Sequence, residues 1–316
     1  MPPVTSPDDP VDCWYLTGAT AVGKTGVGLA LAAELRAEVI SLDSMAIYRG
    51  MDIGTAKPSR EQQARTPHHL LDIVAPHEEY SVAQYVAAAR EKIGEIRARG
   101  REVLFVGGTP LYLKALLRGL FDGPAADWPL RREIEAEVAE VGPRALHERL
   151  QQVDPVAASL IHPHDTRRMI RALEVFRATG EPISHLQVQF EEGRAPEACR
   201  VFVLRRPRPE QQARINARVE EMLSRGLAAE VERLVADGPG LGRTAGQAVG
   251  YREMIEHLAG RLTLAEAEAR IKTRTRRFAK RQETWFRGLS ECRFVDLEGD
   301  ADAIDVARQL IRAGKP

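Results

Sequence analysis

A predicted strand, a glycine-rich turn and a predicted helix follow one another in CWYLT (residues 13–17), GATAVGKT (18–25) and GVGLALAAELRAE (26–38). The two glycines of the turn, Gly18 and Gly23, have the spacing of a phosphate-binding P-loop. Backbone N–H groups of such a loop converge on phosphate oxygens, and the following helix adds its positive end. Lys24 would supply a positive charge and Thr25 a hydroxyl ligand for Mg²⁺. The sequence context therefore predicts a phosphate site without saying which phosphate it binds.

Short apolar runs recur near residues 12–17, 38–42, 103–107, 200–204 and 293–297, and helical patterns separate them. This alternation predicts an α/β fold with a buried parallel sheet and crossover helices. Capping boxes at Ser81-x-x-Gln84 and Thr263-x-x-Glu266 predict two helix starts.

The strand signal disappears between about Pro124 and Phe190, where helical patterns are broken by glycine and proline. We therefore expect three segments: residues 12–123 as the first part of the core, 124–190 as a helical insertion domain, and 191–316 as the second part of the core.

Composition limits the possible classes of protein. The 316 residues can bury a sizeable core, and the formal net charge of zero gives no overall field toward nucleic acid, although local patches still can. The three widely spaced cysteines predict buried thiols in a reducing compartment. No apolar run reaches membrane length, and the first ten residues lack the basic and apolar segments of a signal peptide. We expect a cytoplasmic monomer that does not contact membranes.

Polar residues follow two of the predicted strands. Asp43 comes after the run at 38–42, and Gly107-Gly108-Thr109 ends the run at 103–107. A carboxylate at the carboxyl end of a parallel strand faces the crevice where open α/β sheets bind ligands. Asp43 could thus be a general base, a Mg²⁺ ligand or a cap for the next helix.

A basic segment lies near the end of the chain. Between Arg270 and Arg287 there are eight basic residues and one acid, Glu283. An inward seam is predicted at Ile271, Thr275, Phe278, Gln282 and Trp285. Positive charges gathered on one surface repel each other unless a polyanion binds there. The basic helix therefore predicts binding to a nucleic-acid backbone. The alternative is that this face of the helix is simply solvated.

A second basic helix around Arg167, Arg168 and Arg171 lies in the insertion, where a lid arginine clamping a nucleotide phosphate is the competing interpretation. His68, His69, His162 and His164 lack a third ligand at metal spacing, so they are interpreted as structural.

Seven segments, in this order, give the chain a resemblance to the bacterial-type tRNA dimethylallyltransferases, also called tRNA isopentenyltransferases, over roughly residues 12 to 290. They are GATAVGKT, SLDSMAIYRGMDIGTAKP, HHLLDIV, VGGTPLYLKALLRGL, RRMIRALEVF, GQAVGYRE and FAKRQETWFRG. The resemblance implies a P-loop NTPase/kinase-like core that transfers a dimethylallyl group from dimethylallyl diphosphate to N6 of adenosine at tRNA position 37, beside the anticodon.

The same resemblance implies roles for individual residues. Asp43 matches the general base, Thr25 the hydroxyl near Mg²⁺ and the bridging oxygen, and Arg218 the arginine that grips the diphosphate. The implied diphosphate loop comprises Gly18, Ala19, Thr20, Ala21, Val22, Gly23, Lys24 and Thr25. Val22 stands where a serine is common, and backbone amides should serve regardless. The implied tRNA contacts are Asp43, Ser44, Met45, Ala46, Thr109, Arg131, Arg167, Arg168, Arg171, Gln247, Gly250, Tyr251, Arg252, Lys280, Arg281, Gln282, Trp285 and Arg287.

Two other functions use the same residues. A small-molecule P-loop kinase would employ Lys24, Thr25 and Mg²⁺ with Asp43 activating a hydroxyl, but it leaves the basic helix unexplained. A nucleotide-gated RNA-binding protein would explain the basic helices and leave Asp43 idle.

Overall fold

The computed structural model describes residues 9–119, 123–124, 126–187 and 193–315. The chain divides into two compact units, one formed by Met1–Leu117 with Arg194–Pro316 and the other by Arg118–Gly193. The smaller unit begins six residues before the predicted insertion of 124–190 and ends three residues after it.

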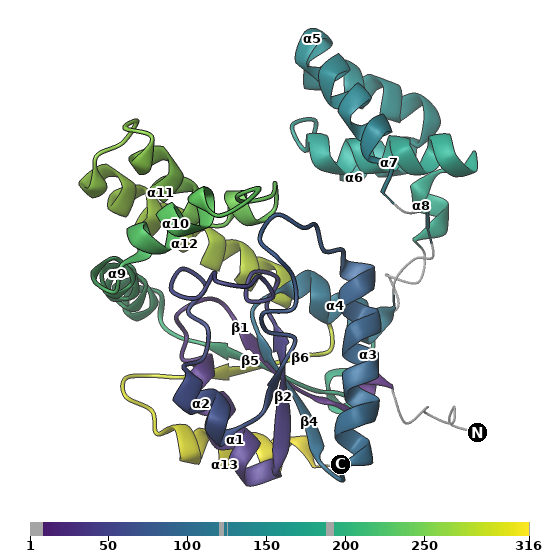
Figure 1. Ribbon diagram of the computed structural model, residues 1–316. Coiled ribbons are helices and arrows are strands. Elements are labelled where there is room, and N and C mark those ends of the chain that lie inside the picture. The colour runs from purple at the N-terminus through teal and green to yellow at the C-terminus, as the bar shows by residue number, and fades with distance from the viewer. Residues whose placement is uncertain (1–8, 120–122, 125, 188–192, 316) are drawn as a thin grey trace, which may run out of the picture. The chain divides into compact units, whose positions relative to one another are not determined.

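The larger unit contains a six-stranded, fully parallel sheet in the order β3-β2-β4-β1-β5-β6 (Figure 1). The strands are β1 (Trp14–Gly18), β2 (Ala37–Leu42), β3 (His68–His69), β4 (Glu102–Gly107), β5 (Arg200–Arg205) and β6 (Cys292–Asp296). Five of them lie where the apolar runs predicted them, so the predicted α/β class is confirmed. The two-residue strand β3 was not predicted.

The order of the strands locates a crevice. The chain leaves β1 toward β2 on one side of the sheet, whereas it leaves β4 toward β5 on the other. Neighbouring strands whose connections diverge in this way form a topological switch point, where open α/β sheets bind ligands beyond the carboxyl ends of the strands. The P-loop follows β1 and the Gly108-Thr109 pair follows β4, so both lie at this point.

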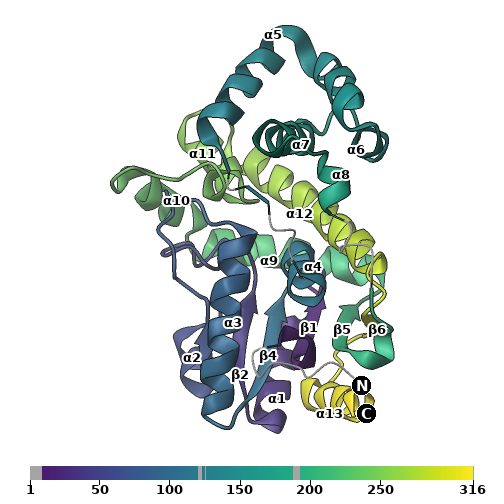
Figure 2. The ribbon, with the colours of Figure 1, turned by 90° about the vertical axis from the view of Figure 1, so that its right-hand side faces the viewer.

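Helices bury both faces of the sheet (Figure 1, Figure 2). On one face, α3 (Val82–Ala98) and α4 (Pro110–Arg118) pack against Tyr15 and Phe105. On the other face, α1 (Lys24–Leu35) and α13 (Ala303–Gly314) pack against Leu16 and Leu104. Alternate side chains of β1 thus pack into cores on opposite faces of the sheet, which explains why the strand is apolar throughout.

A third core lies beyond the sheet and joins the segment after β2 to the C-terminal helices. Its helices are α9 (Arg208–Ser224), α10 (Leu227–Ala236), α11 (Tyr251–Leu258) and α12 (Leu264–Arg287), and Ile47, Tyr48 and Met51 pack among them. The short α2 (Arg60–Arg65) follows this segment. Capping boxes open α3 at Ser81 and α12 at Thr263, as predicted.

The smaller unit is helical and has its own core. It contains α5 (Trp128–Val153), α6 (Pro155–Leu160), α7 (Thr166–Thr179) and α8 (Ile183–Leu186). Gly142, with φ of 82° before Pro143, interrupts α5 with a kink. In the described part of the chain, no helix combines the length and apolar character needed to cross a membrane.

Candidate active site

The P-loop connects β1 to α1 through backbone conformations that favour glycine. Gly18 has φ of 138° and lies so close to β5 that a Cβ atom would be 2.5 Å from the Leu204 carbonyl oxygen. Gly23 has φ of 105° and is the N-cap of α1. A residue with a side chain would strain the first position through both its backbone and the close contact.

Three side chains hold successive carbonyl groups of this loop. Gln211 Nε2 donates to Thr20 O at 3.1 Å, Arg214 Nε to Ala21 O at 2.9 Å, and Arg206 Nε to Val22 O at 2.9 Å. No peptide bond in the described part of the chain is cis, so the N–H of each of these three peptide units points away from its carbonyl oxygen. The N–H groups of residues 21–23 therefore point away from these three side chains, oriented in advance for an anion.

The sequence analysis did not predict these three supporting side chains. Two of them, Gln211 and Arg214, lie on α9 together with Arg218 at steps of three and four, which is the spacing of a single helix face. This polar stripe, on a helix that directly follows strand β5, is the sequence signal that could have identified Gln211 and Arg214.

Lys24 reaches back across the loop. Its Nζ donates to Gly18 O at 3.0 Å and Ala19 O at 2.8 Å. Burial and the neighbouring Arg218 guanidinium lower the pKa of Lys24 to about 7, while the Asp43 carboxylate opposes this shift. An anion in the loop would favour the charged ammonium, which suits a phosphate-binding lysine.

Gln282 of α12 fastens the P-loop to the end of β4. Its Oε1 accepts from the Thr20 amide at 3.0 Å, and its Nε2 donates to the Gly108 carbonyl at 2.5 Å. The residue is only 5% exposed. The resemblance implied a tRNA contact here, but both polar atoms of the Gln282 amide already have partners inside the protein.

Asp43 follows β2 at the same end of the sheet. Its Oδ1 accepts from the Met45 amide at 2.8 Å and the Ala46 amide at 3.3 Å, which belong to a turn. The next helix, α2, has Ser59 as its N-cap, so Asp43 does not have the helix-capping role considered for it. No hydrogen bond to its Oδ2 is found among the described residues. One carboxylate oxygen is thus held by the turn while the other remains available to act as a base.

Asp43, Lys24 and Arg218 influence one another electrostatically. Burial lowers the pKa of Arg218, and the Asp43 carboxylate acts against that shift, as it does for Lys24. One carboxylate thus lies within electrostatic reach of both cations assigned to the diphosphate. The sequence alone left open the possibility that Asp43 lay across the sheet from Lys24.

Thr109 links the end of β4 to the end of β2. Its hydroxyl oxygen accepts from the Ser44 amide at 3.0 Å, and its amide donates to Leu42 O at 3.1 Å. Ser44, Met45 and Thr109 are partly exposed, whereas Ala46 is buried. Direct contact of the Ala46 side chain with tRNA therefore does not fit this structure.

The surface of the basic helix α12 is less uniformly positive than its sequence indicates. Arg270 pairs with Glu256, Arg274 with the buried Glu253, and Lys272 with Glu220 and Glu268. Acids of α9 and α11, together with Glu268 of α12 itself, thus neutralise part of the stripe. Within the described residues we find no ion pair for Arg277, Lys280 or Arg281, and all three are exposed.

The predicted inward seam of α12 is partly wrong. Ile271 and Gln282 are buried as predicted, but Phe278 and Trp285 are 39% and 38% exposed. Their places are taken by Ala279 and Phe286, one position further along the chain. The buried face drifts in this way because 3.6 residues per turn do not keep strict steps of three and four in phase.

The turn before α11 has exposed and inward positions. Gln247 and Arg252 are exposed, whereas Gly250 and Tyr251 are buried. The Tyr251 hydroxyl donates to Glu230 at 2.6 Å, so the side chain of Tyr251 is bound inside the protein. Arg287 at the end of α12 pairs with Glu283 and is exposed.

The arginines predicted for the smaller unit fall into two groups. Arg131 and Arg171 both bind the fully buried Glu174, at 2.9 Å and 2.5 Å. Arg167 and Arg168 are exposed at the start of α7, and Arg168 lies 3.3 Å from Asp165. The tRNA contact of all four stays a prediction.

The four histidines considered above and the three cysteines have these surroundings in the structure. His68 contacts Thr66 O at 2.6 Å, His69 contacts Glu38 at 2.7 Å, and the rings of His162 and His164 lie 5.4 Å apart. All three cysteines are buried. No cluster of three or more His, Cys, Asp or Glu side chains suited to a metal occurs in the described part of the chain.

The residues present nevertheless fit Mg²⁺ bound together with a diphosphate. Thr25 is exposed at the start of α1, and its hydroxyl makes no hydrogen bond among the described residues. Mg²⁺ bound to phosphates needs only one or two protein oxygen ligands, because phosphate oxygens and water complete its shell. The Thr25 hydroxyl is a ligand of that kind, and the free oxygen of Asp43 is left for the base role.

The sheet order, the P-loop and the charged groups beside it define a phosphate-binding P-loop enzyme of the α/β class. Comparison with known proteins is more specific. The family model of IPP transferase matches residues 46–289. The chain therefore belongs to the IPP transferase family, and the predicted resemblance and transferase class are confirmed.

Comparison with individual relatives supports the same family assignment. The tRNA dimethylallyltransferase of Rhodopirellula baltica is 50% identical over 290 residues, covering 89% of this chain and 87% of the relative. The crystal structure of the tRNA isopentenylpyrophosphate transferase of Bacillus halodurans is 40% identical, with a TM-score of 0.69 and 96% coverage of each chain. A eukaryotic dimethylallyltransferase acting on tRNA is 26% identical with a TM-score of 0.76, covering 96% of this chain and 80% of that one.

Proposed function

We propose that this chain transfers the dimethylallyl group of dimethylallyl diphosphate to N6 of adenosine 37 in tRNA, giving N6-isopentenyladenosine and diphosphate. The observation that carries the proposal is the position of a carboxylate, Asp43, directly after β2 and beside the end of β4, where a Cβ atom on Gly108 would lie 3.5 Å from Lys24 Nζ of the P-loop. A phosphate site alone would suit many enzymes. A proton acceptor next to it suits transfer to a weak nucleophile.

The leaving group requires fixed positive charge. When the bond between C1 and the bridging oxygen breaks, its electron pair goes to the diphosphate. Lys24, Arg218 and the N–H groups of residues 21–23 would receive that charge, and removing one such donor typically costs about 10²–10³ in rate. Mg²⁺, held by the Thr25 hydroxyl, would neutralise diphosphate charge when bound.

The nucleophile requires a base. The exocyclic amine of adenine is weakly nucleophilic because its lone pair is delocalised into the ring. As the new N6–C1 bond forms, the amine loses a proton, and the free oxygen of Asp43 is the group we assign to accept it. The hydrogen bonds to Oδ1 hold the carboxylate in one orientation during this step.

The tRNA must deliver an unstacked base. An adenine stacked in the anticodon loop cannot enter a crevice at the end of a sheet, so the nucleotide has to flip out, at a cost of a few kcal/mol. Arg252, Arg277, Lys280 and Arg281 are exposed cations of the larger unit that can bind the backbone and offset that cost. We infer that one chain acts as a monomer in the cytoplasm, where its tRNA substrate is found.

The experiment is mass spectrometry of tRNA nucleosides after incubation with dimethylallyl diphosphate and Mg²⁺. We expect adenosine at position 37 to gain one C₅H₈ unit and diphosphate to be released in equal amount. Unchanged nucleosides would overturn the proposal, and release of ADP from ATP with a hydroxyl acceptor would support the P-loop kinase instead.

A further inference from the structure

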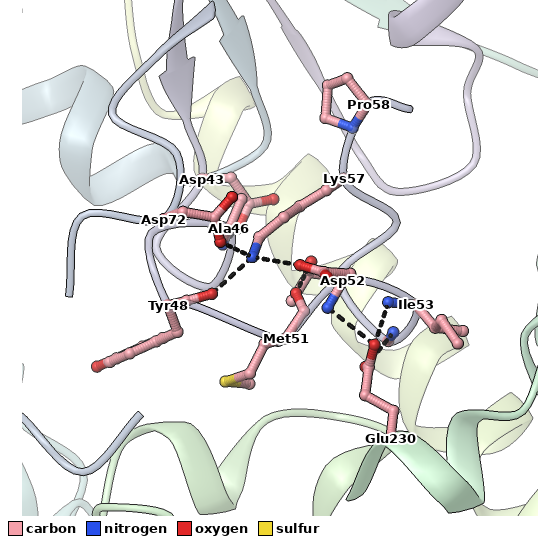
Figure 3. Close-up of polar contacts among 12 residues, drawn as sticks. Asp43, Ala46, Tyr48, Met51, Asp52, Ile53, Lys57, Pro58, Asp72 and Glu230 are labelled. Atoms are coloured by element: carbon pink, nitrogen blue, oxygen red, sulfur yellow. Dashed lines mark hydrogen bonds and ion pairs between the residues drawn. The ribbon is translucent and has the colours of Figure 1, made fainter. Parts of the chain in front are cut away.

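Glu230 of α10 is a buried carboxylate bound almost entirely by backbone. It is 4% exposed and accepts from the amides of Asp52 at 3.0 Å, Ile53 at 2.7 Å and Gly54 at 3.2 Å (Figure 3). Its fourth donor is the Tyr251 hydroxyl, and no cation pairs with it among the described residues. A carboxylate placed in this way fixes the conformation of the three residues whose amides it binds.

Tyr251 has no room to leave this arrangement. A Cβ atom on Gly54 would be 2.4 Å from the Tyr251 ring, so the ring packs directly on the backbone that Glu230 binds. Burial and the Glu230 carboxylate raise the pKa of Tyr251 well above its usual range, which keeps the hydroxyl a hydrogen-bond donor. Tyr251 is the first residue of α11 and follows the turn at 247–250.

Lys57, three residues after Gly54, binds the same stretch of chain through its side chain. Its side chain is 4% exposed, and its Nζ donates to Tyr48 O at 2.6 Å, Asp52 Oδ1 at 2.8 Å and Asp72 Oδ1 at 2.6 Å (Figure 3). All three ammonium hydrogens therefore have acceptors, and Asp52 is bound on its amide by Glu230 and on its carboxylate by Lys57.

A continuous chain of contacts leads from there to Asp43. The Asp72 amide donates to Ala46 O at 3.3 Å, and the Ala46 amide donates to Asp43 Oδ1. Asp43, Ala46, Asp72 and Lys57 lie together in Figure 3. The orientation of the Asp43 carboxylate thus depends on a segment, residues 43–57, that Glu230 and Lys57 hold in place.

We propose that Glu230 is a positioning residue, which ties the first turn of α11 to the segment 43–57 and so orients Asp43 for proton transfer. The inference rests on the proposed function. Because Tyr251 directly follows the turn at 247–250, the same contact joins a predicted tRNA-binding turn to the base that acts on the tRNA.

The test compares Glu230→Gln and Tyr251→Phe with Glu38→Gln. Glu38 is a matched control because it is also a buried carboxylate of the larger unit, on β2 upstream of Asp43, bound by Arg99 and His69. The amide of Glu230→Gln presents hydrogens to backbone donors, and Tyr251→Phe removes one hydrogen bond. The full chain is assayed with tRNA, dimethylallyl diphosphate and Mg²⁺, and the melting temperature of each variant is recorded.

We expect kcat to fall about 10- to 100-fold in Glu230→Gln and less in Tyr251→Phe, as small misplacements of catalytic groups do. The KM for dimethylallyl diphosphate should stay within about twofold, since Gln211, Arg214 and Gln282 hold the P-loop independently. Glu38→Gln should lose stability and keep its kcat.

Two results would overturn the inference while wild-type activity stands: folded Glu230→Gln and Tyr251→Phe with wild-type kcat, or an equal loss of kcat in Glu38→Gln. A wild-type chain that prenylates no tRNA would overturn the proposed function instead.

Discussion

The side-chain carbonyl of Gln282 lies 3.0 Å from the amide nitrogen of Thr20, although 262 residues separate them in sequence. The basic helix α12 is thereby attached to the P-loop. The helix that was predicted to hold tRNA also contributes to the shape of the phosphate site.

Replacing Gln282 by Leu should impair the handling of diphosphate. The Thr20 amide and the Gly108 carbonyl would lose their partners, and each unsatisfied buried group costs about 1–3 kcal/mol. We expect a lower melting temperature and a higher KM for dimethylallyl diphosphate, measured by steady-state kinetics. Thr284→Ala, two residues away and exposed, is the control. An unaltered KM would show that the attachment is dispensable.

Asp43→Asn should abolish transfer and leave tRNA binding intact. Asparagine retains an oxygen for the Met45 and Ala46 amides, so the local turn survives while the proton acceptor is lost. The expected loss in single-turnover rate is about 10²–10⁴-fold, with tRNA affinity in filter binding changed by less than about threefold. Normal turnover would remove Asp43 from the mechanism.

Arg218→Ala should lower kcat about 10²–10³-fold, because the variant would lose a partly buried guanidinium that we assign to the diphosphate. Arg225→Ala is a matched control at the C-cap of the same helix, since Arg225 is exposed and pairs with Glu221 at 3.5 Å. Rapid-quench kinetics with saturating tRNA measures the chemical step. An effect seen only in tRNA affinity would contradict a diphosphate role.

Neutralising Arg277 and Arg281 together should weaken tRNA binding and reduce its salt dependence. Each lost phosphate contact lowers the log–log slope by about 0.7–0.9. The double variant Arg270→Gln with Lys272→Gln is the comparison, because glutamates already neutralise both side chains. Its slope should change less. Equal slopes in both double variants would mean that the unpaired arginines face elsewhere.

Stability should depend on Glu38 at acid pH. Hydrogen bonds from Arg99, and then from His69, lower the pKa of Glu38 below its usual value of 4.5. Its contribution is therefore fully present above pH 4.5 and is lost as the pH falls through the lower pKa of the folded state. Chemical unfolding between pH 6 and pH 3 should show a smaller fall in the free energy of unfolding for Glu38→Gln. Parallel curves would argue against this.

Much of the fold follows from local patterns. The apolar runs that became β1, β2, β4, β5 and β6 were recognisable because strands buried on both faces are apolar throughout. The edge strand β3 consists of His68 and His69, which are polar, and it pairs with Val39 and Ile40 of β2. Its formation depends on a neighbour in space, which no local pattern reports.

The candidate site likewise has features that the sequence predicts and features that it does not. The P-loop and Asp43 could be predicted, because loop spacing and strand ends are local features. The roles of Gln211, Gln282 and Glu230 could not, since each acts on backbone groups 174 or more residues away. The neutralisation of Arg270 and Arg274 was likewise invisible until α11 was packed against α12.

Gly108 marks a place where three parts of the chain meet without spare volume. A methyl group there would lie 2.7 Å from Gln282 Nε2, 3.2 Å from Gly18 O and 3.5 Å from Lys24 Nζ. A saturation library at this position should return glycine alone among active clones. Anyone redesigning the enzyme for a bulkier donor would do better to vary the walls around this junction and leave its centre untouched.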